Sequence, residues 1–225
     1  MTGSINTPYD AIVFDNDGVV VEPTDRTHIV DGVQRAFREF GHDPGRDHAE
    51  WSVATGVGPA GLVGDLPLDP VALWEAREDA VATAQKKATR AGGKGIYDDI
   101  EVLSRLDAPL GLVSNNQAET VRFLLEYHDL RGFETSYGRE HTVAGAARRK
   151  PRPYYLERAL EDLGCEPEAA LYVGDSEKDI VAAHRAGMES AFLRRNHVAD
   201  VSLSVGPTFE MRDLYGLVDA ISTQG

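Results

Sequence analysis

The sequence predicts an α/β fold in which a parallel sheet carries helices on both faces and a helical segment is inserted into the chain. Short apolar runs alternate with amphipathic segments of helical length, and this alternation stops over residues 22–95, which read as mostly helical. Strands that alternate with helices form parallel sheets with both faces covered. We therefore expect a core of residues 1–21 and 96–225, with an insertion of residues 22–95 over the carboxyl edge of the sheet.

Four apolar runs are expected to form strands, because each is short and is followed by polar residues or glycine. They comprise Tyr9–Phe14, Leu110–Val113, Ala170–Val173 and Ser190–Leu193. In sheets of this kind, ligands bind beyond the carboxyl ends of the strands. Asp15, Ser114 and Asp175 each come just after a predicted strand. These three side chains are therefore expected at one shared site.

Capping residues and terminal glycines mark the predicted helices. The helices are expected over residues 116–127, 153–163, 176–187 and 211–221 of the core and over 27–40 and 69–90 of the insertion, where a glycine-rich loop, 56–64, lies between them. Asn116 and Glu119 resemble a capping box, and so do Ser176 and Asp179. Both pairs predict a helix that begins directly after a strand.

The composition indicates an acidic globular protein. Of the 225 residues, 42% are hydrophobic, and the net charge of −14 argues against a nucleic-acid-binding protein. The absence of a long apolar run or a signal peptide predicts a chain that does not associate with membranes. The single cysteine, Cys165, fits a reducing cytoplasm. The basic residues comprise 5 lysines and 18 arginines, which suggests adaptation to high salt, an ordinary acidic bacterial enzyme being the alternative.

The first motif that carries chemistry is Asp15-Asn16-Asp17-Gly18, at the end of the first predicted strand. Two carboxylates separated by one residue can reach the same small volume where the backbone turns. One can attack phosphorus, and the other can carry a proton to the leaving oxygen. Gly18 would allow the turn. Taken alone, the motif is equally compatible with a polar turn or an isolated cation-binding loop.

Three further motifs lie near other predicted strand ends or before a helix. Asp175, in GDSEKD (174–179), is a hard oxygen ligand suited to Mg²⁺, whereas Asp179 could either ligate the ion or cap the helix. Lys150, in KPRP (150–153), could balance the charge of a phosphate. Ser114, in VSNN (113–116), could donate a hydrogen bond to a phosphate oxygen. Each of these motifs alone could be an ordinary loop.

The order and placement of the four motifs resemble the haloacid dehalogenase superfamily of phosphotransferases. The matching segments are FDNDGV (14–19), GIYDDIEVLSRL (95–106), LVSNN (112–116), KPRPYYLERALEDLG (150–164) and YVGDSEKDIVAAHRAG (172–187). The resemblance implies a Rossmann-like parallel core and an inserted α-helical cap over residues 22–95. Closure of this cap would exclude water and select the substrate, and its opening would release the product.

The resemblance also implies the roles of the acidic residues. Asp15 would be the nucleophile that forms an aspartyl-phosphate, and Asp17 would be first the general acid and then the base that activates water. Mg²⁺ would be held by Asp15, the backbone carbonyl of Asp17 and Asp175. Asp179 would be either a further ligand or a residue just outside the ligand shell.

Residues of the other motifs would orient the substrate. Ser114 and Lys150 would hold the phosphoryl group, and Mg²⁺ and Lys150 would offset the repulsion between Asp15 and the phosphate. Asn115, Asn116 and Gly18 are expected beside the substrate.

The helical insertion between the first two motifs resembles the cap of the phosphoglycolate phosphatase and beta-phosphoglucomutase branch. The second aspartate, Asp17, disfavours a metal-free dehalogenase. Mutases often carry an arginine in the cap loop, and residues 55–65 contain none, so a phosphatase acting on a small phosphorylated metabolite is favoured. A mutase-like phosphotransferase and a non-catalytic binding protein are the alternatives.

The cap residues Arg90 and Lys94 could contact an anionic substrate. They follow Lys86 at intervals of four residues, which places Lys86 and Arg90 on one helical face. A solvated face is the alternative interpretation of the same spacing. The oligomeric state, monomer or weak dimer, stays open.

Overall fold

The computed structural model describes residues 4–222, so the predicted core boundaries at residues 1 and 225 lie outside the described range. Within it, six parallel strands form one sheet in the order β3-β2-β1-β4-β5-β6. The strands are β1 Ala11–Phe14, β2 Leu110–Gln117, β3 Phe133–Arg139, β4 Ala170–Gly174, β5 Glu189–Leu193 and β6 Phe209–Met211. The α/β prediction and all four predicted strands are confirmed, whereas β3 and β6, at the two edges, were not predicted.

The central strand β1 sets the register of the sheet. Ile12 lies opposite Leu110 of β2 and Leu171 of β4, and all four residues of β1 are buried. Burial on both faces explains why these runs are continuously apolar rather than alternating. The parallel pairing brings the carboxyl ends of β1, β2 and β4 to the same edge, where the predicted motifs follow.

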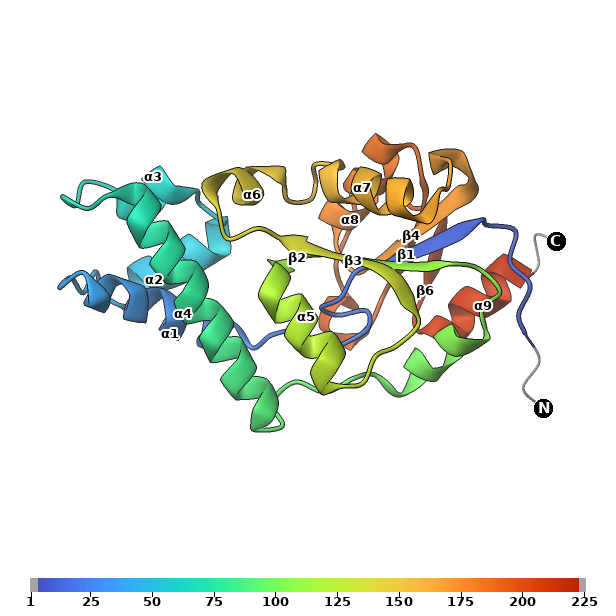
Figure 1. The fold of residues 1–225 in the computed structure, drawn as a ribbon, viewed down its shortest axis with the longest axis horizontal. Helices are drawn as coiled ribbons and strands as arrows, with labels where there is room; N and C mark the ends of the chain where they lie inside the picture. Colours follow the sequence, from blue (N-terminus) through green and yellow to red (C-terminus); the bar gives the residue numbers. More distant parts are fainter. Residues whose placement is uncertain (1–3, 223–225) are drawn as a thin grey trace.

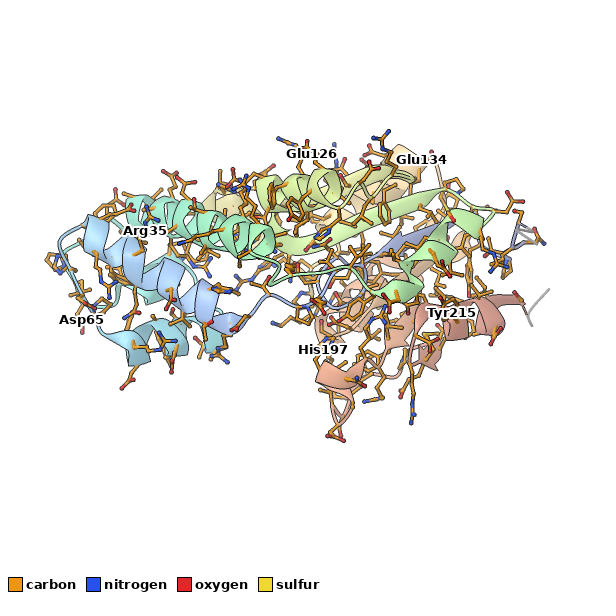
Figure 2. The ribbon with its side chains drawn as sticks, turned by 90° about the horizontal axis from the view of Figure 1, so that it is seen from below. Arg35, Asp65, Glu126, Glu134, His197 and Tyr215 are labelled. Atoms are coloured by element: carbon orange, nitrogen blue, oxygen red, sulfur yellow. The ribbon has the colours of Figure 1, made fainter. Side chains whose placement is uncertain are left out.

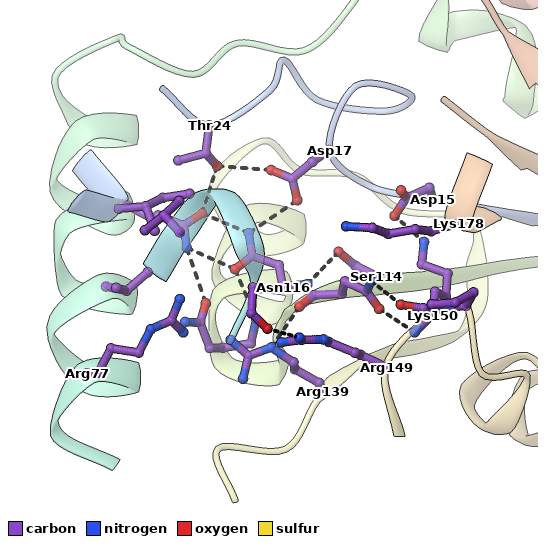
Figure 3. A pocket seen from close by; sticks show the side chains of 18 of the residues that line it. Asp15, Asp17, Thr24, Arg77, Ser114, Asn116, Arg139, Arg149, Lys150 and Lys178 are labelled. Atoms are coloured by element: carbon purple, nitrogen blue, oxygen red, sulfur yellow. Dashed lines mark hydrogen bonds and ion pairs between the residues drawn. The ribbon is translucent and has the colours of Figure 1, made fainter. Parts of the chain in front are cut away.

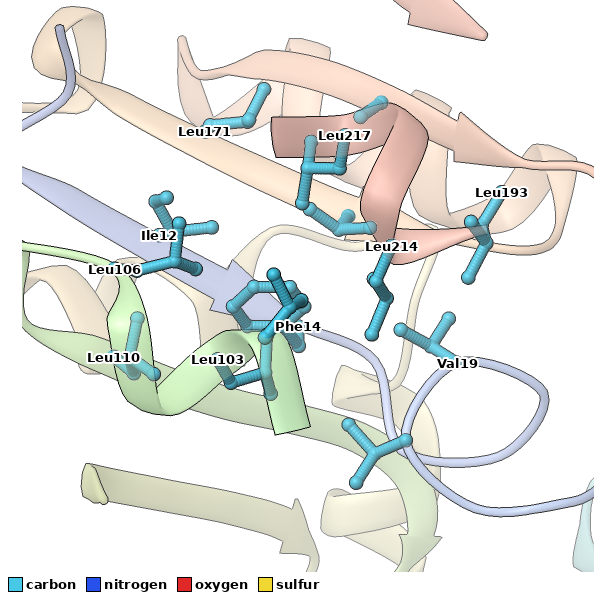
Figure 4. Close-up of a cluster of buried hydrophobic side chains, with 14 of the residues drawn as sticks. Ile12, Phe14, Val19, Leu103, Leu106, Leu110, Leu171, Leu193, Leu214 and Leu217 are labelled. Atoms are coloured by element: carbon cyan, nitrogen blue, oxygen red, sulfur yellow. The ribbon is translucent and has the colours of Figure 1, made fainter. Parts of the chain in front are cut away.

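Helices cover both faces of this sheet and build two hydrophobic clusters (Figure 1). The core helices are α5 Ala118–Tyr127, α6 Val143–Arg148, α7 Tyr154–Leu163, α8 Glu177–Ala186 and α9 Leu214–Ser222, and η1 Asp98–Arg105 is a 3₁₀ helix. One cluster packs α5, α9 and η1 against the sheet around Phe14 and Leu214 (Figure 4). The other packs α7 and α8 on the opposite face around Tyr172 and Leu156.

The insertion forms a group of helices that we call the cap. It contains α1 Arg26–Glu39, α2 Arg46–Thr55, α3 Pro59–Val63 and α4 Pro70–Arg90, which extend beyond the sheet at the left of Figure 1. The cap has its own hydrophobic cluster, centred on Phe37, Leu73 and Trp74. Asp25 and Asp69 cap α1 and α4 by accepting backbone N–H bonds. The insertion is therefore helical as predicted, but α3 replaces part of the expected loop at 56–64.

Two predicted helix starts are wrong. The helix expected from Asn116 begins only at Ala118, because β2 continues to Gln117, and within the described part of the chain no side chain caps the helix. The Asn116 side chain instead binds the side chains of Asp17 and Gln85. The last helix begins at Leu214 rather than at residue 211, which belongs to β6.

The other helix signals agree with the structure. Ser176 and Asp179 form the predicted capping box at the start of α8. Gly164 and Gly187 end α7 and α8 in the left-handed conformation.

The surfaces of the cap and of the core carry many charged side chains that point outward. Figure 2 shows Asp65 of the cap and Glu126 and Glu134 of the core directed outward. Among residues 4–222, no helix combines the length and the apolar character needed to cross a membrane.

Candidate active site

A cavity of about 510 Å³ lies between the cap and the carboxyl edge of the sheet (Figure 3). Residues directly after β1 and at the carboxyl end of β2 form one side of its lining, and α4 contributes to the other. Of the residues predicted from the sequence, the lining contains Asp15, Asp17, Ser114, Asn115, Asn116 and Lys150. Side chains that are up to 135 positions apart in the chain therefore meet at one end of the sheet, as expected for parallel strands.

Asp15 and Lys150 form a buried ion pair. The Lys150 Nζ lies 2.9 Å from Asp15 Oδ1 and 2.6 Å from Asp179 Oδ1, and it donates to the Tyr172 hydroxyl at 2.6 Å and to the Val113 carbonyl at 3.1 Å. Burial alone would lower the pKa of Lys150, but the two carboxylates outweigh it and raise that pKa. The ammonium is thus held charged and aimed at Asp15.

Three carboxylates converge beside this ammonium. Asp15, Asp175 and Asp179 each offer an oxygen, and these oxygens lie within 4.8 Å of one another. Burial first, and the proximity of Asp179 and Asp175 second, raise the pKa of Asp15 well above its usual range, although Lys150 opposes the shift. Three hard oxygen donors with a single ammonium between them fit a divalent cation such as Mg²⁺.

Asp179 caps α8, as its sequence position allowed, and its other carboxylate oxygen lies in the carboxylate cluster. Its Oδ2 accepts from the Ser176 backbone N–H at 3.0 Å and from the Ser176 hydroxyl at 2.6 Å, which caps α8. Its Oδ1 faces Lys150 within the carboxylate cluster. Capping therefore does not remove Asp179 from the candidate metal site.

Gly18 is required by the backbone and by its surroundings. Its φ of +81° lies in the region that favours glycine, and a Cβ there would lie 1.9 Å from Asp175 Oδ2 and 2.8 Å from His197 Nε2. His197 also forms a 2.7 Å contact with Asp175 Oδ2. Gly18 is outside the cavity lining, so the structure places it against Asp175 and His197 rather than at the cavity wall.

Asp17 is held by groups from several parts of the chain. Its carboxylate accepts from Lys94 Nζ, from the Thr24 hydroxyl at 3.0 Å, and from the side-chain amides of Asn16 and Asn116, each at 3.2 Å. Burial alone would raise the pKa of Asp17, but Lys94 and the amides outweigh it and lower that pKa. Lys94 is buried and absent from the cavity lining, so it serves Asp17 instead of forming an exposed basic edge.

Gln85 of α4 links the cap to the core. Its Oε1 accepts from the hydroxyl of Thr24 and the amide of Asn116, both at 2.8 Å, and its Nε2 donates to Asn116 Oδ1 at 2.9 Å and Gln117 Oε1 at 3.2 Å. The cap is therefore closed onto the end of β2 in this structure.

The asparagine side chains of the second motif are engaged with the protein. Asn115 both donates to the carbonyl and accepts from the N–H of Lys150, at 3.0 and 2.8 Å, which ties residue 150 to the end of β2. The Ser114 hydroxyl accepts from the Asn116 backbone N–H at 3.0 Å. Its own proton is thus free to point toward the cavity.

The structure does not bring Arg90 to the cavity. Its guanidinium lies 4.8 Å from the centre of the Phe123 ring, and Arg90 is not among the residues that line the cavity.

Several residues of the site were not singled out in the sequence. Tyr172 is one, and a tyrosine in an otherwise aliphatic buried strand is a usable signal, because its hydroxyl needs a partner. Lys178, Arg77, Arg139 and Arg149 also line the cavity. They lie outside the four motifs or at unremarkable positions within them, and only the folded chain brings them together.

Comparisons with known proteins agree with this geometry. The family profile of the haloacid dehalogenase-like hydrolases matches residues 9–187. Pyrophosphatase PpaX of Anoxybacillus flavithermus is 27% identical over 190 residues, which cover 84% of this chain and 83% of the relative. PpaX of Oceanobacillus iheyensis is 34% identical, but the aligned 96 residues span only 44% of its length and 43% of this chain.

Among solved structures, CbbY of Rhodobacter sphaeroides in complex with phosphate superimposes with a TM-score of 0.69 at 18% identity, covering 93% of this chain and 96% of CbbY. A Lactobacillus plantarum protein provisionally assigned as a phosphoglycolate phosphatase has a TM-score of 0.68 at 15% identity, covering 94% and 98%. At these identities, the likeness is one of fold.

Proposed function

The chain belongs to the haloacid dehalogenase-like hydrolase family, and we propose that it is a Mg²⁺-dependent phosphatase that hydrolyses a small phosphate monoester through an aspartyl-phosphate on Asp15. The observation that carries the proposal is the arrangement at the end of β1. Asp15 opens onto the cavity between Lys150 and the carboxylates of Asp175 and Asp179, and Asp17 faces the same cavity two residues later.

In the first step, a carboxylate oxygen of Asp15 attacks phosphorus and the bond from phosphorus to the ester oxygen breaks. Asp17 gives a proton to the departing oxygen, and because Lys94 and the side-chain amides lower its pKa, it has to take up that proton before the step. Ser114 and Lys150 hold the phosphoryl oxygens. In the second step, Asp17 takes a proton from water, and the water oxygen attacks phosphorus. Inorganic phosphate leaves and Asp15 is restored as a carboxylate.

Charge is the main obstacle to the first step, because an anionic nucleophile has to approach an anionic phosphate. Lys150 offsets part of this repulsion from a fixed, buried position. Asp15, Asp175 and Asp179, with the backbone carbonyl of Asp17, would hold Mg²⁺, which when bound supplies further positive charge at the phosphoryl oxygens and favours the ionised form of Asp15. The high pKa that burial imposes on Asp15 makes this second source of charge important.

The substrate is proposed to be a small phosphorylated metabolite, because the cavity between the cap and the sheet has a volume of about 510 Å³. Phosphoglycolate is a suitable first substrate. Pyrophosphate, an anhydride rather than an ester, is tested beside it, since PpaX relatives are named pyrophosphatases. Residues 22–95 would open to admit the substrate and to release the product.

The test is hydrolysis of p-nitrophenyl phosphate with Mg²⁺, with EDTA, and by the Asp15→Asn variant, at low and high salt. We expect activity that requires Mg²⁺ and is lost in the variant. Asp65→Asn is the matched control, because it makes the same change at an exposed cap position without an ion-pair partner in the described structure. Activity that survives in Asp15→Asn, or that is unaffected by EDTA, would refute the proposal.

The same preparation separates hydrolysis from phosphoryl transfer within a sugar phosphate, the alternative raised by the sequence. Release of inorganic phosphate from the substrate indicates a phosphatase. Conversion of one sugar phosphate isomer into another without such release indicates a mutase.

A further inference from the structure

Three arginines gather at the cavity on the side away from Asp15 and Lys150 (Figure 3). Arg77 lies on α4 of the cap, Arg139 ends β3, and Arg149 precedes the loop to α7. Burial lowers the pKa of Arg77 and of Arg149, and repulsion from Arg139 lowers both further, although Glu78 opposes the two shifts; Arg77 also repels Arg149. The two lobes therefore place like charges against each other where they meet.

The charge of this group is only partly balanced. Glu78 is fully buried and forms ion pairs with Arg77 and Arg139. Arg149 has no carboxylate within ion-pair distance among residues 4–222; it donates to the Gly56 carbonyl of the cap. Three cations thus face one anion.

The rest of the lining does not correct this imbalance. The whole lining has five basic side chains and two acidic ones, Asp15 and Asp17, in a protein whose net charge is −14. Both aspartates belong to the reaction centre, where Lys150 and Lys94 pair with them. The excess positive charge is therefore concentrated around Arg77, Arg139 and Arg149.

A purely structural network would explain Arg139, whose Nε also donates to the Asn115 carbonyl at 2.9 Å. It does not explain Arg149, because a backbone carbonyl gives little compensation for a half-buried guanidinium beside two others. Guanidinium groups bind carboxylate and phosphate oxygens in a forked geometry. An anion among the three would remove the repulsion and join the cap to the core.

We propose that Arg77, Arg139 and Arg149 form a second anion-binding site, so that the substrate is a small phosphate monoester with a second anionic group, carboxylate or phosphate, at its other end. This inference rests on the proposed phosphatase function and refines it. Lys150 and the carboxylate cluster receive the reacting phosphoryl group, and the arginines bind the remote anion. Binding of that anion contributes to cap closure, because Arg77 belongs to the cap while the other two belong to the core.

The test compares substrates that differ in the remote group alone, at low ionic strength. The first pair tests a remote carboxylate: phosphoglycolate carries it, and hydroxyethyl phosphate has a hydroxyl in its place. The second pair tests a remote phosphate: propanediol bisphosphate carries it, and hydroxypropyl phosphate has a hydroxyl in its place. We expect kcat/KM to be roughly tenfold to hundredfold higher for the doubly anionic member of at least one pair, the ratio expected for one or two charge-assisted hydrogen bonds. The pair with the larger ratio identifies the remote group.

Two variants assign this preference to the arginines. Arg149→Gln and Arg77→Gln act from the two lobes, and each is expected to reduce the preference at least about tenfold. Arg148→Gln is the matched control, because Arg148 is adjacent, 41% exposed and paired with Glu140 outside the cavity. Circular dichroism and thermal melting confirm that each variant is folded. An absent preference in the parent protein, or one that both variants retain, would overturn the inference.

Failure of the phosphatase proposal gives a different pattern. If no phosphate ester is hydrolysed, binding of phosphoglycolate and hydroxyethyl phosphate to the Asp15→Asn protein is measured by calorimetry. Tighter binding of phosphoglycolate that disappears with Arg149→Gln supports the anion site without the reaction. Equal binding of the two compounds overturns the anion site.

Discussion

Replacing Lys150 by methionine tests the central charge arrangement. The substitution keeps the approximate size of the side chain but removes the ammonium that contacts Asp15 at 2.9 Å and Asp179 at 2.6 Å. Three clustered carboxylates then remain without that cation. Removing one partner of a buried ion pair costs about 3–5 kcal/mol. For a chain of this size, each kcal/mol lowers Tm by about 2–4 °C, which gives a decrease of roughly 6–20 °C in EDTA.

The loss should depend on Mg²⁺ and on pH. The pKa of Asp15 is raised in the folded state, mainly by burial, so between its ordinary value and this raised value the folded state binds more protons than the unfolded state. Stability then falls as pH rises through that interval. Loss of Lys150 raises the pKa further, so the destabilisation should be largest near neutral and alkaline pH and smaller in mild acid. Mg²⁺ should restore part of the stability by replacing the lost positive charge.

The assay is thermal unfolding of the parent and Lys150→Met proteins, in EDTA and in Mg²⁺, across pH. Lys178→Met is the matched control, since Lys178 also lines the cavity but is exposed. The control should melt close to the parent. If Lys150→Met melted as the parent does in EDTA at neutral pH, the carboxylate cluster would not need the ammonium, and the charge argument for the site would be wrong.

Three further predictions concern other features. Gly18→Ala should fold but bind Mg²⁺ more weakly in a titration followed by activity, because the added Cβ displaces Asp175. Asp99→Ala should lower the free energy of unfolding in urea by about 3–5 kcal/mol, because it leaves the buried Arg195 without its two contacts at 2.8 and 3.0 Å. The acidic surface predicts that the free energy of unfolding increases with KCl concentration.

Matched variants isolate each cause. Gly41 also has a positive φ, but a Cβ added there would contact nothing within 4 Å among residues 4–222 apart from its chain neighbours. Gly41→Ala therefore shares the backbone strain without the clash and should keep its Mg²⁺ affinity. Asp98 is exposed beside Asp99, and Asp98→Ala should change stability little. Equal losses in either pair would contradict the corresponding prediction. A free energy of unfolding that is already maximal in dilute buffer would contradict the salt prediction.

The sequence predicted the parts of the fold in which local pattern and burial agree. The four central strands are apolar because both of their faces are covered. β3 was missed because its exposure alternates and its residues, FETSYGR, include polar side chains. β6 has only three residues. Asn116 was expected to cap a helix, but its side chain is needed by Asp17 and Gln85, and tertiary contacts prevailed over the local signal.

Some residues of the candidate site could be predicted from the sequence and others could not. Asp15 and Asp17 were predictable because they stand in a compact motif at a strand end, and Lys150 because it stands in a compact motif just before a helix. The arginine group was not, because residues 77, 139 and 149 come from three separate elements and nothing in their local sequence distinguishes them from solvated arginines. Their significance comes only from mutual proximity in the folded chain.

The contacts of Asp17 have a consequence for timing. The chain leaves the core through residues 21–25 and returns through residues 93–96, and these segments pair at Val21 and Ile96. Thr24 of the outgoing segment and Lys94 of the returning one both hold the Asp17 carboxylate, and Gln85 of α4 bonds to Thr24. A rotation of the cap about these two segments would disturb the bonds that orient Asp17. Asp17, the proposed proton donor, would then be correctly oriented only while the cap is closed onto the core. The two connecting segments would thus couple cap closure to the orientation of Asp17.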